Sequence, residues 1–83
     1  MYSIIIGRRA QKSIAGLPGD AGPRVRAAIA ALGADPRPHG CRKLTGRDEW
    51  RIRVGDYRVL YLLNDSARLV TVIAVGHRRD IYA

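Results

Sequence analysis

The sequence predicts an α+β fold in which a helical hairpin packs on a mainly antiparallel four-stranded sheet, in the order β-α-α-β-β-β. Three observations lead to this prediction. Residues 50–54 alternate between apolar and charged side chains, and a Gly-Asp turn joins them to a second run of strand-forming residues. Residues 69–75 are almost continuously apolar, as in a central strand. Apolar residues between 10 and 32 recur at helical spacing.

The first two elements are a strand and a helix. Residues 2–6 form a short apolar run that predicts the first strand. From Arg8 onward, apolar residues recur at i, i+4 and i+7, which is the stripe of an amphipathic helix. Pro18 and Gly19 follow the stripe and end the helix. The stripe consists of Ala10, Ile14 and Leu17.

A second helix is predicted around Pro23, because proline suits the first turn of a helix. Gly33 is expected to cap its C-terminus. Two prolines then stiffen residues 35–40, which carry no periodicity and lead the chain into the sheet. The buried face of this helix should consist of Val25, Ala28, Ile29 and Leu32. The exposed cations of the two helices are expected to be Arg8, Arg9, Lys12, Arg24 and Arg26.

The hairpin formed by residues 50–63 carries the strongest functional signal. A two-residue turn at Gly55 and Asp56 sets Arg53 opposite Arg58, and Arg51 opposite Leu60. Opposed residues share a face, so the arginines lie on one face. Like charges directly opposite each other destabilise a sheet by up to about 1 kcal/mol, so the cluster indicates an anionic ligand. The other face should be apolar and packed in the core, with Trp50, Ile52, Val54, Tyr57, Val59 and Tyr61.

The length and the charge of the chain limit its possible functions. The 83 residues suffice for one domain, 1–83. The net charge of +8, with arginine commoner than lysine, indicates a polyanionic partner: RNA, DNA or an acidic protein. Cys41 is the only cysteine, which excludes an intrachain disulfide. Because neither a secretory signal nor a membrane-spanning apolar stretch is evident, we expect a soluble cytoplasmic protein.

Four further candidates follow the last strand. RNA cleavage without a metal needs a base for the 2'-OH, cations for the phosphorane and an acid for the leaving oxygen. Arginines stay charged and suit the second role, whereas His77 and Tyr82 are both candidates for proton transfer. Two histidines and one cysteine match no metal-ligand pattern, so we expect neither a metal nor another cofactor. The four candidates are His77, Arg78, Arg79 and Tyr82.

Several motifs resemble one family over nearly the whole chain. The most specific are WRIRVGDYRVLY at residues 50–61 and VGHRRDIY at residues 75–82. Weaker ones are Leu17-Pro18, Asp35-Pro36-Arg37 and Lys43-Leu44-Thr45-Gly46. On these motifs the chain resembles the RelE/ParE superfamily of toxins from type II toxin–antitoxin systems, and its RelE branch in particular. The resemblance implies a ribosome-dependent endoribonuclease that cuts mRNA in the A site, leaves a 2',3'-cyclic phosphate and is neutralised by a cognate antitoxin.

The resemblance also assigns site residues. Arg51 and Arg53 fall where such toxins often have two basic residues, frequently lysines, and Arg58 matches the arginine of the G-x-Y-R motif. Arg78 and Tyr82 match the arginine after the last strand and the tyrosine near the C-terminus. Because arginine is a poorer base than lysine, proton transfer should fall on Tyr82 or His77. We add as RNA-binding candidates Lys43, Arg47 and Arg79.

Two other functions remain open. A ParE-like toxin of the same fold would inhibit DNA gyrase through protein contacts and cut no RNA. A degenerate copy would only bind nucleic acid or its antitoxin. The expected partners under the main hypothesis are the cognate antitoxin, the ribosome and mRNA, with no membrane and no small-molecule cofactor. Codon preference, the general base and the identity of the antitoxin do not follow from the sequence.

Overall fold

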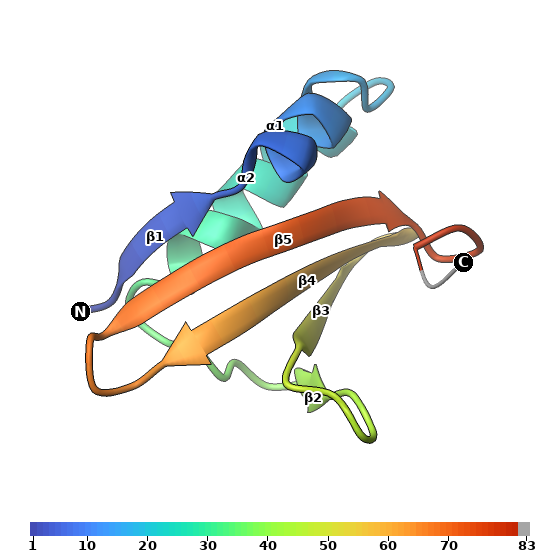
Figure 1. Ribbon diagram of the computed structural model, residues 1–83. Coiled ribbons are helices and arrows are strands. Elements are labelled where there is room, and N and C mark those ends of the chain that lie inside the picture. The colour runs from blue at the N-terminus through green and yellow to red at the C-terminus, as the bar shows by residue number, and fades with distance from the viewer. Residues whose placement is uncertain (82–83) are drawn as a thin grey trace.

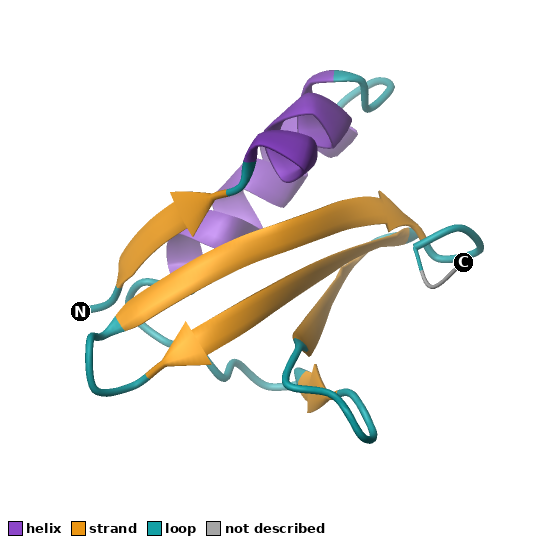
Figure 2. Cartoon of the chain, in the orientation of Figure 1, coloured by secondary structure: helices purple, strands orange, loops and turns teal. Residues whose placement is uncertain are grey.

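The computed structural model, which describes residues 1–81, has two helices packed on one face of a five-stranded mixed sheet (Figure 1). The order of the strands across the sheet is β1-β5-β4-β3-β2. Figure 2 shows the strands as one twisted layer, with α2 behind it and α1 above β5 in this view. The α+β class and the helical hairpin are therefore confirmed. The elements are β1 (Ser3–Ile6), α1 (Arg8–Ala15), α2 (Ala21–Ala31), β2 (Arg42–Lys43), β3 (Trp50–Val54), β4 (Tyr57–Asn64) and β5 (Leu69–His77).

The sheet has one strand more than the four predicted. The additional strand, β2, has two residues and pairs antiparallel with β3, so that Arg42 lies opposite Arg51 and Lys43 opposite Trp50. Two residues are too few to show a period of two, and they follow a proline-rich segment without periodicity. Only the pairing with β3 makes this segment a strand.

The predicted register of the central hairpin is confirmed in every pair. Trp50 lies opposite Tyr61, and Val54 lies opposite Tyr57. Gly55, the first residue of the turn, has φ of +59°, which glycine adopts without the strain that a side chain would cause. β4 continues antiparallel into β5, while β1 pairs parallel with β5 at the other edge of the sheet.

The core lies between the helices and the helix-facing side of the sheet. Of the seven residues that the helical spacing predicted as buried, Leu17 and Ala28 are half-buried. The other five are buried, namely Ala10, Ile14, Val25, Ile29 and Leu32. They pack against the hairpin side chains Ile52, Val59 and Tyr61 and against three valines of β5. Burying each large side chain contributes about 1.5–3 kcal/mol. Gly33 does not act as a left-handed cap. A Cβ there would come within 3.2 Å of the Tyr2 carbonyl oxygen, so close packing favours glycine.

A β-bulge shifts the pairing of β5 halfway along its length. Tyr61 lies opposite Val72, but the preceding residue, Leu60, lies opposite Ala74, so Ile73 is extra. One extra residue reverses which side chains face the helices. Consequently Gly76 lies opposite Arg58, and His77, at the end of β5, lies opposite Tyr57. β5 therefore extends two residues beyond the predicted strand.

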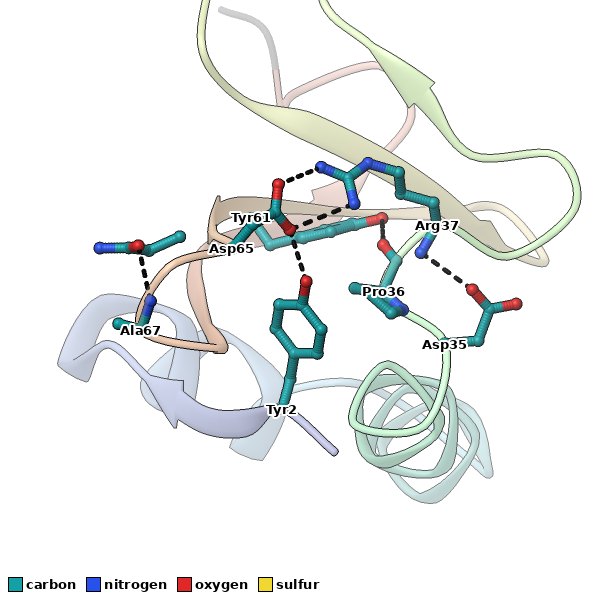
Figure 3. A network of polar contacts seen from close by, with 8 residues as sticks. Tyr2, Asp35, Pro36, Arg37, Tyr61, Asp65 and Ala67 are labelled. Carbon is teal, nitrogen blue, oxygen red and sulfur yellow. Dashed lines mark hydrogen bonds and ion pairs between the residues drawn. The ribbon is translucent and has the colours of Figure 1, made fainter.

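A polar network fixes the proline-rich segment against the sheet (Figure 3). The Arg37 guanidinium donates two hydrogen bonds to the Asp65 carboxylate, at 2.8 and 3.2 Å, and stacks 4.9 Å from the centre of the Trp50 ring. The Tyr2 hydroxyl donates to the same carboxylate at 2.5 Å, and the Tyr61 hydroxyl donates to the Pro36 carbonyl oxygen at 2.8 Å. These bonds position the segment that leads into β2.

Four groups of the network have a shifted pKa, and the hydrogen bond to Asp65 raises that of the Arg37 guanidinium. The hydrogen bond from Arg37 lowers the pKa of the Asp65 carboxyl, and the bond to Asp65 raises the pKa of the Tyr2 hydroxyl. Burial raises the pKa of the Tyr61 hydroxyl well above its usual value, so it remains a hydrogen-bond donor. Within residues 1–81, neither helix is long and apolar enough to cross a membrane.

Candidate functional site

Four arginines lie on the open face of the sheet, the face turned away from α1 and α2. The pairing sets Arg42 opposite Arg51, and Arg53 opposite Arg58, and directly opposed residues share a face. Three of the four were predicted from the hairpin register. Arg42 was missed, because its place depends on the short strand β2. We call Arg42, Arg51, Arg53 and Arg58 the arginine cluster.

The members of the arginine cluster differ in exposure. Arg42 and Arg53 are exposed, Arg58 is half-buried and Arg51 is only 9% exposed. Among residues 1–81, the Nε atom of Arg51 is buried without a hydrogen-bond partner. Leaving a buried donor unsatisfied costs about 1–3 kcal/mol, and more when the group is charged. An anion bound beside Arg51 would supply the missing acceptor.

Arg78 lies at the end of the arginine cluster nearest the β3–β4 turn. Its backbone N–H donates to the Asp56 carbonyl oxygen at 2.9 Å, which ties the segment after β5 to that turn. The chain then folds back, and a Cβ on Gly76 would lie 3.5 Å from Cβ of Ile81. Because Gly76 is the partner of Arg58, the C-terminal turn lies beside the arginine cluster. Tyr82, the predicted proton-transfer residue that follows, lies outside the described residues.

The structure does not bring His77 together with the arginines. The bulge places His77 on the helix-facing side, where its ring meets that of Tyr57 edge-on, with ring centres 5.9 Å apart. The His77 Nδ1 accepts a hydrogen bond from the Arg79 backbone N–H at 3.2 Å. These contacts are those of a packing side chain, and they hold the His77 ring on the side of the sheet away from the arginine cluster.

The other predicted RNA-binding residues are spread over the molecule. Lys43 lies opposite Trp50 and hence on the face opposite to Arg42. Arg47, in the β2–β3 loop, forms an ion pair with Glu49 at 2.5 Å. Arg79 is exposed in the turn after β5. None of the three therefore belongs to the arginine cluster.

The arginine cluster can bind phosphate and stabilise developing negative charge. Guanidinium groups stay protonated and offer donors in a fork that matches phosphate oxygens. The cluster has no member suited to accept a proton at neutral pH. Residues 1–81 contain no group of three or more His, Cys, Asp or Glu side chains that could hold a metal ion. The arrangement is that of an anion site that depends on a separate group for acid–base chemistry.

Comparisons with known proteins agree on one superfamily. A family model described as the ParE toxin of the type II toxin–antitoxin system parDE matches residues 4–82. The RelE–RelB complex of Pyrococcus horikoshii OT3 contains a chain that is 27% identical, with a TM-score of 0.83, and the match covers 95% of this chain and 97% of that one. A chain of the Escherichia coli RelBE complex is 26% identical, with a TM-score of 0.78 and coverage of 93% and 96%.

A third similar structure is the RelBE2 complex of Mycobacterium tuberculosis. The matching chain is 26% identical, with a TM-score of 0.71, and the match covers 93% of this chain and 98% of that one. No protein in the set of curated sequences gives a significant match. All three structures are complexes of a toxin with its antitoxin.

Proposed function

The chain belongs to the ParE toxin family, within the RelE/ParE superfamily of type II toxin–antitoxin systems. From its arginine cluster and its likeness to RelE structures, we propose that it inhibits translation by cutting mRNA on the ribosome. The observation that carries the proposal is the arginine cluster, with Arg53 directly opposite Arg58 on the sheet face turned away from the helices. A toxin that acted only through protein contacts would not need this concentration of like charge. The proposal includes one domain, 1–83, that acts in the cytoplasm.

The proposed reaction is an internal attack on the RNA backbone. The 2'-hydroxyl gives its proton to water and its oxygen attacks the neighbouring phosphorus. The bond to the 5'-oxygen breaks, and a 2',3'-cyclic phosphate and a 5'-hydroxyl result. Arg53, Arg58 and Arg78 hold the extra negative charge of the phosphorane. Tyr82 gives a proton to the departing 5'-oxygen. The reaction needs no metal in this scheme.

Weak intrinsic acid–base chemistry supports a dependence on the ribosome. Within residues 1–81 the cluster offers cations but no base for the 2'-OH. Fixing the mRNA so that the 2'-oxygen points at the phosphorus contributes a large part of such a rate enhancement. We expect the free protein to cut naked RNA poorly.

The proposal is tested by primer extension on an mRNA in a reconstituted translation reaction. The toxin is added with ribosomes present or omitted, and the double variant Arg53→Ala/Arg58→Ala serves as a matched control. We expect cuts within codons only when ribosomes and the unaltered toxin are both present. Intact mRNA in the presence of folded toxin would overturn the proposal.

The second candidate is inhibition of DNA gyrase. It is favoured by one observation, namely that the matching family model is that of ParE. A supercoiling assay with purified gyrase distinguishes the two, because an mRNA-cutting toxin leaves supercoiling unchanged. Loss of supercoiling together with intact mRNA would assign the chain to this second function.

The antitoxin partner is supported by the complexes that resemble this chain. With a net charge of +8 on the toxin, the binding segment of the antitoxin should be acidic. The proposed mode of neutralisation is direct, with this segment lying over the arginine cluster. A complex that leaves Arg53 and Arg58 uncovered would contradict direct blocking.

A further inference from the structure

A groove of about 460 Å³ runs along the edge of the sheet, between α2 and β3. Its apolar wall includes Ala28 and Ala31 of α2, and Pro38 of the segment that the Arg37 network holds in place. The groove is also lined by His39, Arg42 and Arg51. We call this the edge groove. It adjoins the center of the proposed reaction, because Arg53 also lines it, and it contains His39 in addition.

The electrostatics of the edge groove are one-sided. Arg42, Arg51 and Arg53 all line it, whereas no Asp or Glu does so among residues 1–81. Arg51 is nine-tenths buried, and its Nε lacks an acceptor within the same part of the chain. Arg42 lies directly opposite Arg51, so their side chains start from neighbouring positions on one face. A buried guanidinium beside a second one calls for an anionic group.

We propose that the edge groove binds a phosphate of the RNA strand next to the one that is cut. Arg51 and Arg42 bind this phosphate, and His39 donates a hydrogen bond to it. The ribose packs against the wall formed by Ala28, Ala31 and Pro38. The inference rests on the proposed function, because it takes RNA as the ligand.

Continuity with the arginine cluster favours RNA over an acidic peptide. Arg53 lines the edge groove and also lies opposite Arg58, whose partner Gly76 begins the segment that leads to Arg78. A polynucleotide carries one charge on every nucleotide, so a single strand can meet both places in turn. An RNA strand that crosses the edge of β3 is therefore bound at two points, one on each side of the bond that is cut.

The test is a binding measurement that does not need cleavage. The probe is a fluorescein-labelled single-stranded RNA with 2'-O-methyl groups, which lacks the attacking hydroxyl, and fluorescence anisotropy follows its affinity as salt is varied. Arg42→Ala should weaken binding and reduce the slope of log K against log salt by about 0.7, the value for one phosphate contact to a single strand. His39→Ala should weaken binding with a smaller effect on the slope.

Arg26→Ala is the matched control, because it removes one exposed arginine of α2 that does not line the edge groove. If Arg42→Ala and Arg26→Ala change the slope of log K against log salt equally, the inference is overturned. The effect would then depend only on the net charge of the protein. A second pair of variants tests the wall. Ala31→Glu places a carboxylate in the groove and should lower the RNA affinity at least tenfold. Ala30→Glu adds the same charge at an exposed neighbouring position that does not line the groove, and it should not lower the affinity to this extent.

Competition and cleavage separate the remaining outcomes. Polyglutamate and unlabelled RNA of equal total charge are compared as competitors of the labelled RNA. If the two displace it equally well, the inference is overturned in favour of an acidic peptide. If the slope effect of Arg42→Ala appears but no mRNA is cut on ribosomes, the edge groove stands and the proposed function fails. If mRNA is cut but Arg42→Ala binds the probe normally, the function stands and the inference fails.

Discussion

Arg53 and Arg58 illustrate at the scale of single residues how a binding site can oppose folding. They lie directly opposite each other across β3 and β4, a pairing in which like charges repel each other. We predict that Arg58→Thr raises the free energy of unfolding by a few tenths to about 1 kcal/mol, because threonine suits a strand and removes the repulsion. The same variant should lose at least about 10²-fold in ribosome-dependent cleavage. Urea unfolding and primer extension measure the two effects, and a variant that is less stable than the unaltered protein would contradict the first.

The choice between His77 and Tyr82 for proton transfer is also a question about single residues. The His77 ring meets Tyr57 on the helix-facing side of the sheet. We predict that His77→Phe, which keeps a ring at this position, changes cleavage less than tenfold. Tyr82→Phe and Arg78→Ala should each lower it by about 10²-fold or more. Single-turnover cleavage of mRNA on stalled ribosomes measures all three, and a larger loss in His77→Phe than in Tyr82→Phe would reverse the assignment.

The elements differ in how well the sequence predicts them. β3 and β4 follow from strict alternation and a two-residue turn, and α1 and α2 from apolar stripes, because these patterns are local. The bulge at Ile73 is different, since the run of apolar residues in β5 has no alternation that would reveal an extra residue. That single residue decides which face His77 occupies. The positions of Arg51, Arg53 and Arg58 could therefore be predicted, because they follow from the hairpin register. The positions of Arg42 and His77 could not, because they depend on β2 and on the bulge.

The network around Asp65 gives the segment before β2 a dependence on pH. Because Arg37 lowers the pKa of Asp65 in the folded protein, the ionised carboxylate stabilises the fold. This contribution is complete above the pKa of the unfolded chain, about 4, and is lost as the pH falls through the lower folded value. We predict that Asp65→Asn is less stable than the unaltered protein at pH 7 and loses less stability on acidification. Thermal unfolding from pH 7 to pH 2 measures this.

Asp48→Asn is the control for that experiment, because Asp48 is exposed in the β2–β3 loop and does not belong to the Arg37–Asp65 ion pair. It should follow the pH dependence of the unaltered protein. If the stability of Asp65→Asn and of the unaltered protein changes with pH in the same way, the ion pair contributes nothing measurable to the free energy of unfolding. Both side chains of this ion pair are exposed, which weakens such pairs.

At the scale of the whole molecule, the open face has two chemically different ends. The arginine cluster lies over β2, β3 and β4, whereas at the opposite edge Ile5 of β1 is 52% exposed. Its neighbours Ile4 and Ile6 pack on the core, so Ile5 points to the open face. A partner that covers the whole face therefore needs acidic residues toward one end and apolar residues toward the other. An antitoxin segment can combine the two, whereas RNA would use only the basic end.

Because the two ends of the open face differ, we predict that one substitution can weaken antitoxin binding without affecting cleavage. Ile5→Ser removes apolar surface at the edge far from the arginine cluster, so cleavage of mRNA on ribosomes should stay within about twofold of the unaltered protein. Binding of the cognate antitoxin should weaken by about tenfold or more, because burying an isoleucine side chain contributes about 1.5–3 kcal/mol. Titration calorimetry of the complex measures the affinity, and Ala27→Ser, an exposed change on α2, is the control. Equal affinities for Ile5→Ser and the control would restrict the antitoxin to the basic end of the face. A loss of both cleavage and binding would instead mean that β1 must stay intact for the sheet to hold the arginines in place.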